Sequence, residues 1–199
     1  MCTFEIQGEC RRLLKEDFNK SCQDLAIYLL GKTLARKLKS GEILKGQIVE
    51  TECYLGGEDK ASHSYNGNIE PGAVVLLRAL EPRLGINIME NYRILGTKRK
   101  NQVTGIKSVN LCNGPSKLCI AMNITKQNAN KLDLTDLLND RLWIEDGPSI
   151  NGGRIVNSTR IGIGPSAEEW VLKPLRYYIL TNKSVSKRDK NAEGHICSK

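Results

Sequence analysis

Two side chains suited to acid–base chemistry and to stacking on a planar ligand stand two residues apart in the chain. Glu52 and Tyr54 belong to the run Ile48–Gly56, whose β-branched and apolar residues predict a strand that ends at a pair of glycines. Because side chains alternate along a strand, Glu52 and Tyr54 share one face. If this face borders a cleft, a carboxylate able to activate water enters it beside an aromatic ring. His63, one of two histidines, follows across a short loop.

The same pattern also has an ordinary structural interpretation. Glu50 is predicted on the same face, and charged residues of a strand usually face water. A single tyrosine or histidine is more often packed than catalytic. The strand by itself therefore leaves both interpretations of Glu52 open.

Four further motifs follow the Glu50–Gly56 run and His63 in a fixed order. They are LLRALEP at Leu76–Pro82, LCNGPSKL at Leu111–Leu118, RIGIG at Arg160–Gly164 and KPLRYY at Lys173–Tyr178. The series resembles the active-site signature of the alkyladenine (3-methyladenine) DNA glycosylase family, from Leu25 to about Val185. Several motifs in the right order are far more specific than any one of them.

The resemblance implies a monofunctional DNA glycosylase that flips a damaged purine out of the duplex and hydrolyses its N-glycosidic bond. The substrates expected are alkylated purines (3-methyladenine, 7-methylguanine) or deaminated purines. By resemblance, Glu52 orients and deprotonates the water, and Arg78 and the backbone carbonyl of Ile161 help to hold it. Tyr54 and His63 match two residues that stack on the flipped base. We expect neither a cofactor nor a metal.

The sequence departs from the family pattern after residue 67. The family continues there through a tyrosine-rich strand pair, whereas here the chain runs almost directly into Gly72–Arg78. The resemblance assigns to the missing piece a third stacking ring, a tyrosine wedge inserted into DNA, and an asparagine that helps to reject guanine. A skipped exon or an incomplete gene model would produce such a gap. The main alternative is therefore a catalytically impaired DNA-binding variant. A generic RNA-binding protein is a weaker one, since no RNP1 or KH signature is visible.

The charge distribution favours an anionic partner. The chain has 30 Lys and Arg against 22 Asp and Glu, a net charge of +8, and nucleic acid is the commonest partner of such a protein. Between Tyr92 and Lys131 there are eight basic residues and no acidic one. We expect this stretch to face DNA phosphates, through Lys98, Arg99 and Lys100, and through Lys117 near the helix start at Pro115.

The sequence pattern predicts the helices and strands that must position these residues. Together they indicate a single mixed α+β domain, with a curved antiparallel β core and surrounding helices. Residues 1–20 are expected to be loosely ordered, 21–182 to form the glycosylase domain, and 183–199 to form a basic, disordered tail. Helices are predicted over Ser21–Leu30 and Ile86–Leu95, and strands over Thr33–Leu38, up to Tyr54, over Ala73–Leu80 (central in the sheet), Arg154–Gly164 and Trp170–Leu180.

The cysteines and apolar runs bear on the compartment. Seven scattered cysteines without a C-x-x-C pair predict neither a disulfide framework nor a zinc site, and favour a reducing environment. The longest apolar runs are too short for a membrane span, and residues 1–22 lack the core of a secretory signal. We expect a monomer that binds double-stranded DNA containing a damaged purine, in the nucleus or in a bacterial cytoplasm.

Overall fold

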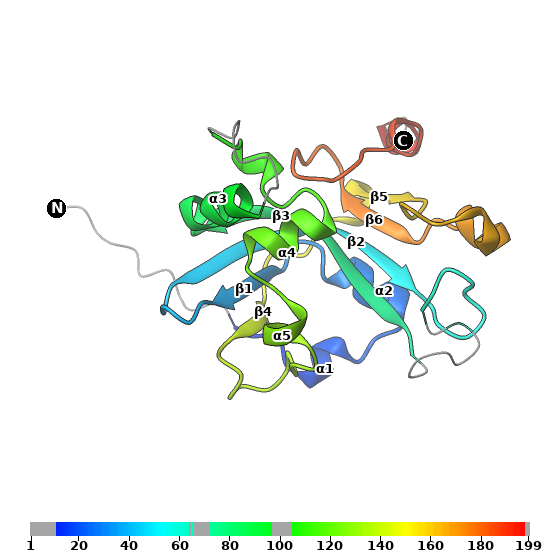
Figure 1. The fold of residues 1–199 in the computed structure, drawn as a ribbon. Coiled ribbons are helices and arrows are strands. Elements are labelled where there is room, and N and C mark those ends of the chain that lie inside the picture. Colours follow the sequence, from blue (N-terminus) through cyan, green and yellow to red (C-terminus); the bar gives the residue numbers. More distant parts are fainter. Residues whose placement is uncertain (1–10, 64, 66–71, 97–104, 198–199) are drawn as a thin grey trace.

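The longest strand, β2 (Ile43–Tyr54), forms the centre of the sheet (Figure 1). A computed structural model describes residues 11–63, 65, 72–96 and 105–197 of the chain. β2 pairs along one side with β3 (Val74–Leu84), and on the other first with β1 (Thr33–Lys37) and then with β6 (Arg176–Ile179). β4 (Leu142–Glu145) extends the sheet beyond β1, and β5 (Ile155–Ser158) extends it beyond β6. All pairings are antiparallel, which confirms the predicted α+β class.

Irregular pairing in β2 occurs where two carboxylates stand. The register against β3 shifts between Ile48 and Glu50 and again between Glu50 and Thr51. Such shifts re-aim side chains locally. Residues Ile48 to Cys53 are all buried, because helices cover the sheet here. Thr51 Oγ1, for example, donates to the carbonyl of Ala26 at 2.8 Å. Glu50 is fully buried, so it does not face water as a strand carboxylate usually does.

The prediction that the 73–80 strand is central in the sheet is wrong. Within the described residues β3 pairs with β2 alone, apart from an isolated bridge between Ala79 and Asn113. Its apolar residues pack instead against α2 (Cys22–Tyr28) and α4 (Pro115–Ala121). An edge strand whose two faces are covered by helices has the same continuous run of apolar residues as a strand in the centre of a sheet. The sequence therefore did not distinguish the two positions.

Local signals placed the helices well. Ser21 caps α2 by accepting from the amide of Asp24, and Pro115 is the first residue of α4. The remaining helical elements are α1 (Lys15–Phe18), α3 (Ile86–Leu95), η2 (Ser108–Asn110), α5 (Lys126–Ala129), η3 (Gly152–Arg154), η4 (Pro165–Val171) and α6 (Lys190–Cys197). None of the helices in the described residues has the length and apolar character that a bilayer crossing requires.

Both flanking segments are more ordered than predicted. Leu13 is buried, and its amide donates to the carbonyl of Ile144 at 2.8 Å, so residues 11–20 are not loosely held. Ser184 and Val185 are also buried, and α6 follows them, so the expectation of a disordered tail is wrong for 184–197. Polar composition predicted disorder, but several of these polar groups have specific buried partners. Residues 1–10 and 198–199 lie outside the described residues.

Candidate active site

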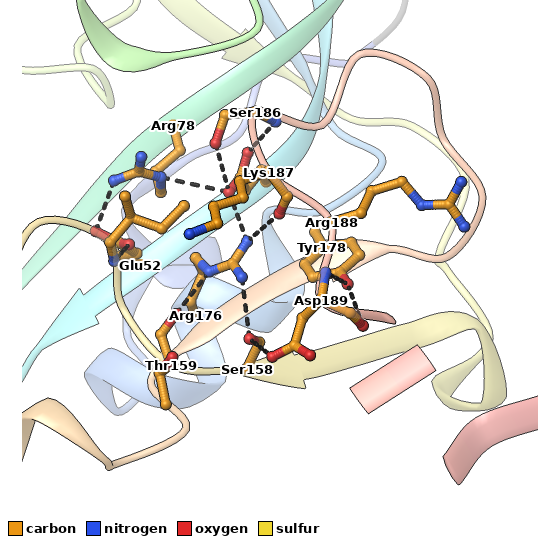
Figure 2. A network of polar contacts seen from close by, with 12 residues as sticks. Glu52, Arg78, Ser158, Thr159, Arg176, Tyr178, Ser186, Lys187, Arg188 and Asp189 are labelled. Carbon is orange, nitrogen blue, oxygen red and sulfur yellow. Dashed lines mark hydrogen bonds and ion pairs between the residues drawn. The ribbon is translucent and has the colours of Figure 1, made fainter. Parts of the chain in front are cut away.

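The carboxylate of Glu52 has no exposed surface and is contacted by three residues; Figure 2 shows it beside Arg78. Its Oε1 accepts from the backbone amide of Ile161 at 2.7 Å, and its Oε2 accepts from the Tyr54 hydroxyl at 2.9 Å. Arg78 Nη1 lies 3.1 Å from the same Oε2 as an ion pair. Four of the five residues predicted to form the site thus come from β2, β3 and the loop after β5, and meet at one carboxylate.

The part of Ile161 that contacts Glu52 is its amide. The resemblance pointed to the carbonyl of this residue as a water ligand, whereas the hydrogen bond in the structure is donated by the N–H group. Gly162, the next residue, has φ of 79°, a conformation that side chains other than glycine adopt at a cost. The glycine therefore permits the turn that directs the amide at Glu52.

Tyr54 is partly buried and engaged at both ends of its side chain. The guanidinium of Arg160 lies 4.7 Å from the ring centroid, within the range of a cation–π contact. Burial raises the pKa of Tyr54 well above its usual value, and the neighbouring Glu52 carboxylate raises it further. The phenol therefore stays protonated near neutral pH and donates to Glu52.

Arg160 also anchors the loop that leads from Tyr54 to His63. It forms two hydrogen bonds with Asp59, at 2.6 and 3.0 Å, and both side chains have no exposed surface. The two oxygens of Asp59 also accept from the amides of Leu55 and Ala61, each at 3.0 Å. The sequence motifs gave no part to Asp59. Its place in a short glycine-containing loop, where aspartates often bind nearby amides, was the available signal.

His63 lies exposed at the end of this loop. Within the residues that the structure describes, no hydrogen bond or ion pair joins it to Glu52 or Tyr54. The stacking of His63 on a flipped base therefore stays a prediction.

A second carboxylate, Glu50, lies behind Glu52 and is also fully buried. It accepts hydrogen bonds from Arg176 Nη1 at 2.9 Å, from the Ser186 amide at 2.7 Å and from the Ser186 hydroxyl at 2.9 Å. Arg78 Nε lies 3.3 Å away as an ion pair. Sequence reasoning gave Glu50 no function, and placed Ser186 in a disordered tail. Figure 2 shows the network that these residues form.

A cavity of about 410 Å³ lies next to this network, and basic residues outnumber acidic ones in its lining. Ile161, whose amide donates to Glu52, is one of the residues that line this cavity. Its charged lining residues are Arg160, Arg176, Lys187, Arg188, Asp189 and Lys190. A larger cavity, of about 600 Å³, lies between the N-terminal segment and the β1–β4 edge and contains none of the predicted site residues.

The residues predicted to bind phosphate are only partly visible. Lys98, Arg99 and Lys100 lie outside the described residues. Lys117 is exposed on α4, where its Nζ donates to Asn113 Oδ1 at 2.8 Å. Among the residues that are described, no group of three or more His, Cys, Asp or Glu side chains could hold a metal ion.

A buried carboxylate, held by an arginine and a backbone amide beside a basic cavity, is suited to an enzyme that activates water against an anionic substrate. A sequence model of the family described as methylpurine-DNA glycosylase matches residues 16–71 and 67–183. The chain therefore belongs to the methylpurine-DNA glycosylase family, enzymes of DNA repair that hydrolyse N-glycosyl bonds, as its motifs indicated.

Relatives from three kinds of organism agree with this assignment. The chain is 37% identical over 201 residues to the probable DNA-3-methyladenine glycosylase of Encephalitozoon cuniculi, covering 85% of this chain and 90% of the relative. It is 38% identical over 221 residues to the human DNA-3-methyladenine glycosylase, covering 94% and 72%. It is 36% identical over 215 residues to a putative 3-methyladenine DNA glycosylase of Clostridium botulinum, covering 88% and 99%.

The comparisons also show an interruption in the family pattern. The two stretches that match the family meet at residues 67–71, where the motif series breaks. The alignment with the human relative is 221 residues long, longer than the 199-residue chain. That relative therefore has residues with no counterpart here.

Proposed function

We propose that this chain excises damaged purines from double-stranded DNA by flipping the base and hydrolysing its N-glycosidic bond. The substrates are alkylated purines such as 3-methyladenine and 7-methylguanine, or deaminated purines. The observation that carries this proposal is the buried Glu52 carboxylate, held by Arg78, Tyr54 and the Ile161 amide in a chain of this family.

Glu52 acts on the water in the proposed reaction. Each carboxylate oxygen can accept more than one hydrogen bond, so Glu52 can accept from a water while its present donors stay in place. The carboxylate deprotonates this water as it attacks the anomeric carbon, and its charge stabilises the positive charge that develops on the sugar. Arg78 and Ile161 fix the direction of the carboxylate, and the reaction requires no cofactor.

Base recognition falls to Tyr54 and His63. Arg160 covers one face of the Tyr54 ring, so a flipped base stacks on the other face. Alkylated purines are electron-poor or cationic and stack well on an electron-rich ring. They are also good leaving groups, so part of the selectivity is chemical. Lys98, Arg99, Lys100 and Lys117 bind the phosphates, and a monomer suffices for this arrangement.

A second candidate function is a DNA-binding protein with impaired catalysis. The interruption of the family match at residues 67–71 favours it, because the resemblance places the wedge and a stacking ring in the missing segment. The two candidates differ in the excision rate and share the binding surface.

The test of the proposed function is Glu52→Gln, in a form of the chain with the missing segment restored. Single-turnover release of hypoxanthine from a duplex should be abolished while DNA affinity is largely kept, because Glu52 supplies chemistry and the basic surface supplies affinity. Glu145→Gln is the matched control, a buried glutamate paired with Lys45 at 2.8 Å on the far strand β4. Excision by Glu52→Gln at the unmodified rate would remove Glu52 from the mechanism.

A further inference from the structure

We propose that Glu50 is a positioning residue for the glycosylase reaction. It holds Arg78 in the orientation that contacts Glu52, and Ser186 in turn holds Glu50. This inference rests on the proposed role of Glu52, and it brings the 184–189 segment into the support of the active site.

Arg78 lies between the two carboxylates. Its Nε is 3.3 Å from Glu50 Oε1, and its Nη1 is 3.1 Å from Glu52 Oε2. An arginine side chain has several rotatable bonds, and a single contact at the end of the guanidinium leaves rotation about these bonds available. The second contact, at Nε, is an ion pair without a hydrogen bond. With a carboxylate against each of two atoms of the guanidinium, rotation of the group is restricted, so Nη1 stays directed at Glu52.

Glu50 has enough fixed donors to serve as an anchor. Its two oxygens accept three hydrogen bonds, one from Arg176 and two from Ser186, all between 2.7 and 2.9 Å. Arg176 is itself held by the carbonyls of Thr159 and Lys187, at 2.7 and 2.8 Å. The carboxylate therefore has little freedom to follow a movement of Arg78.

Stability alone does not account for this arrangement. Removing a carboxylate from water is costly, and a buried ion pair often contributes no more stability than a well-packed apolar pair. The charged Glu50 carboxylate instead orients the Arg78 guanidinium toward Glu52. The shifted register of β2 on both sides of Glu50 allows both carboxylates to reach one guanidinium.

Ser186 brings a distant segment into contact with this anchor. Its amide and its hydroxyl both donate to Glu50, across 136 positions of sequence. Val185, immediately before it, is buried in the hydrophobic core and fixes the segment against the sheet. A change at Ser186 should therefore reach Glu52 through Glu50 and Arg78.

The experiment compares Glu50→Gln and Ser186→Ala with two matched controls in the 199-residue chain. Glu145→Gln changes a buried, ion-paired glutamate away from the site. Ser184→Ala removes a buried hydroxyl that has no hydrogen-bond partner among the described residues of the chain. The first readout is exchange of the Arg78 Nε–H proton with water, measured by NMR. The second is single-turnover release of 3-methyladenine and 7-methylguanine from methylated single-stranded DNA, the substrate on which the 199-residue chain is expected to keep residual activity. Thermal melting and affinity for an abasic duplex are measured alongside.

We expect Glu50→Gln to accelerate the Arg78 proton exchange and to slow excision by about tenfold or more, with abasic-DNA affinity unchanged. Ser186→Ala should do the same to a smaller extent, and its effect should vanish in the Glu50→Gln background, since residues acting through one another are not additive. Both controls should match the unmodified chain. Because Ser186→Ala keeps the Ser186 amide and both charges, it tests the proposal even if Glu50→Gln fails to fold.

Unchanged Arg78 exchange in both variants overturns the proposal. So does full additivity of the two substitutions, or a loss of excision that only parallels a loss of folded protein. Failure of the proposed function gives a different result, in which the unmodified chain releases no base or Glu52→Gln keeps its rate. In that case the Arg78 exchange still decides whether Glu50 positions the arginine.

Discussion

Tyr54 combines two tasks in one side chain. Its hydroxyl donates to Glu52 at 2.9 Å, and its ring lies against the Arg160 guanidinium. Because burial raises the pKa of Tyr54, the hydroxyl remains a donor across the pH range in which the enzyme can work. The contribution of the hydroxyl can therefore be separated from that of the ring by removing one oxygen atom.

Tyr54→Phe should slow excision by about tenfold or more, because a hydrogen bond to a charged group is worth roughly 1.5–3 kcal/mol. DNA affinity should change little, since the ring stays. The measurement is single-turnover excision with the missing segment restored, and Tyr92→Phe on α3, whose hydroxyl accepts weakly from Asn123 at 3.4 Å, is the control. Equal rates for Tyr54→Phe and the unmodified protein would show that Glu52 does not depend on this donor.

The loop between β2 and His63 depends on a single buried ion pair. Asp59 holds two amides of the loop with the same carboxylate that binds Arg160. Burial by itself would raise the pKa of Asp59, but the hydrogen bonds from Arg160 and from these amides outweigh it and lower the pKa below the usual 3.8. The ionised form is therefore the one that the fold stabilises.

Asp59→Asn should lower the free energy of unfolding by about 3–5 kcal/mol at pH 7, since it leaves Arg160 as a buried, uncompensated charge. The pH dependence has a definite sign. The folded pKa lies below the unfolded one, so the contribution of Asp59 is present above about pH 4 and is lost as the pH falls through the folded pKa. Urea denaturation of both proteins should show their difference shrinking at acid pH.

Asp140→Asn is the control for this experiment. Asp140 pairs with Lys37 at 2.8 Å on the surface, and its loss should change stability little. A comparable, small effect of Asp59→Asn would mean that Arg160 finds another partner or water.

Elements with local signals were predictable, and elements that depend on distant partners were not. Ser21 and Pro115 mark helix starts through groups within a few residues, so α2 and α4 were found. Glu52 was found only through the family motif, because alternation along a strand shows no partner. Glu50 is buried and accepts hydrogen bonds from Ser186, 136 positions away. The residues around Glu50 give no sign of Ser186, and the polar residues around Ser186 give no sign of Glu50, so this contact was not predicted.

At the scale of the whole molecule, charge is separated along the chain. The acid-free stretch from Tyr92 to Lys131 has a charge of +8, as large as the net charge of the protein. Acidic residues follow it directly, at Asp133, Asp136, Asp140, Glu145 and Asp146. If the basic stretch faces DNA, affinity depends strongly on salt.

Neutralising Lys98, Arg99 and Lys100 together should weaken duplex binding. The plot of log affinity against log salt concentration should become less steep by roughly 0.9 for each phosphate that the variant no longer neutralises. Fluorescence anisotropy over a salt series measures both quantities. Neutralising three lysines outside the stretch, Lys15, Lys20 and Lys37, is the control. If affinity and slope are the same in both triple variants, the acid-free stretch is only a solvated surface.

The 199-residue chain itself should bind duplex DNA weakly and excise little or nothing from a fully paired site. Flipping costs a few kcal/mol, each tenfold in population corresponds to about 1.4 kcal/mol, and the wedge that the resemblance assigns is missing. Residual activity should favour single-stranded or mismatched substrates. The comparison is with a chain in which the segment after residue 67 is restored. Equal excision of a paired duplex by both chains would contradict this expectation.

The hydrogen bonds from Ser186 to Glu50 have a consequence for how the protein is made. At about 5–20 residues per second, the ribosome needs on the order of ten seconds to add the residues between the two. Throughout this interval the nascent chain contains Glu50 without the two Ser186 donors, and the closing contact spans 136 positions, a separation that slows folding. If Glu50 positions Arg78 as proposed, a nascent chain that has not yet reached Ser186 already contains Glu52, Tyr54, Arg78 and Ile161 but lacks two of the hydrogen bonds that hold their support in place.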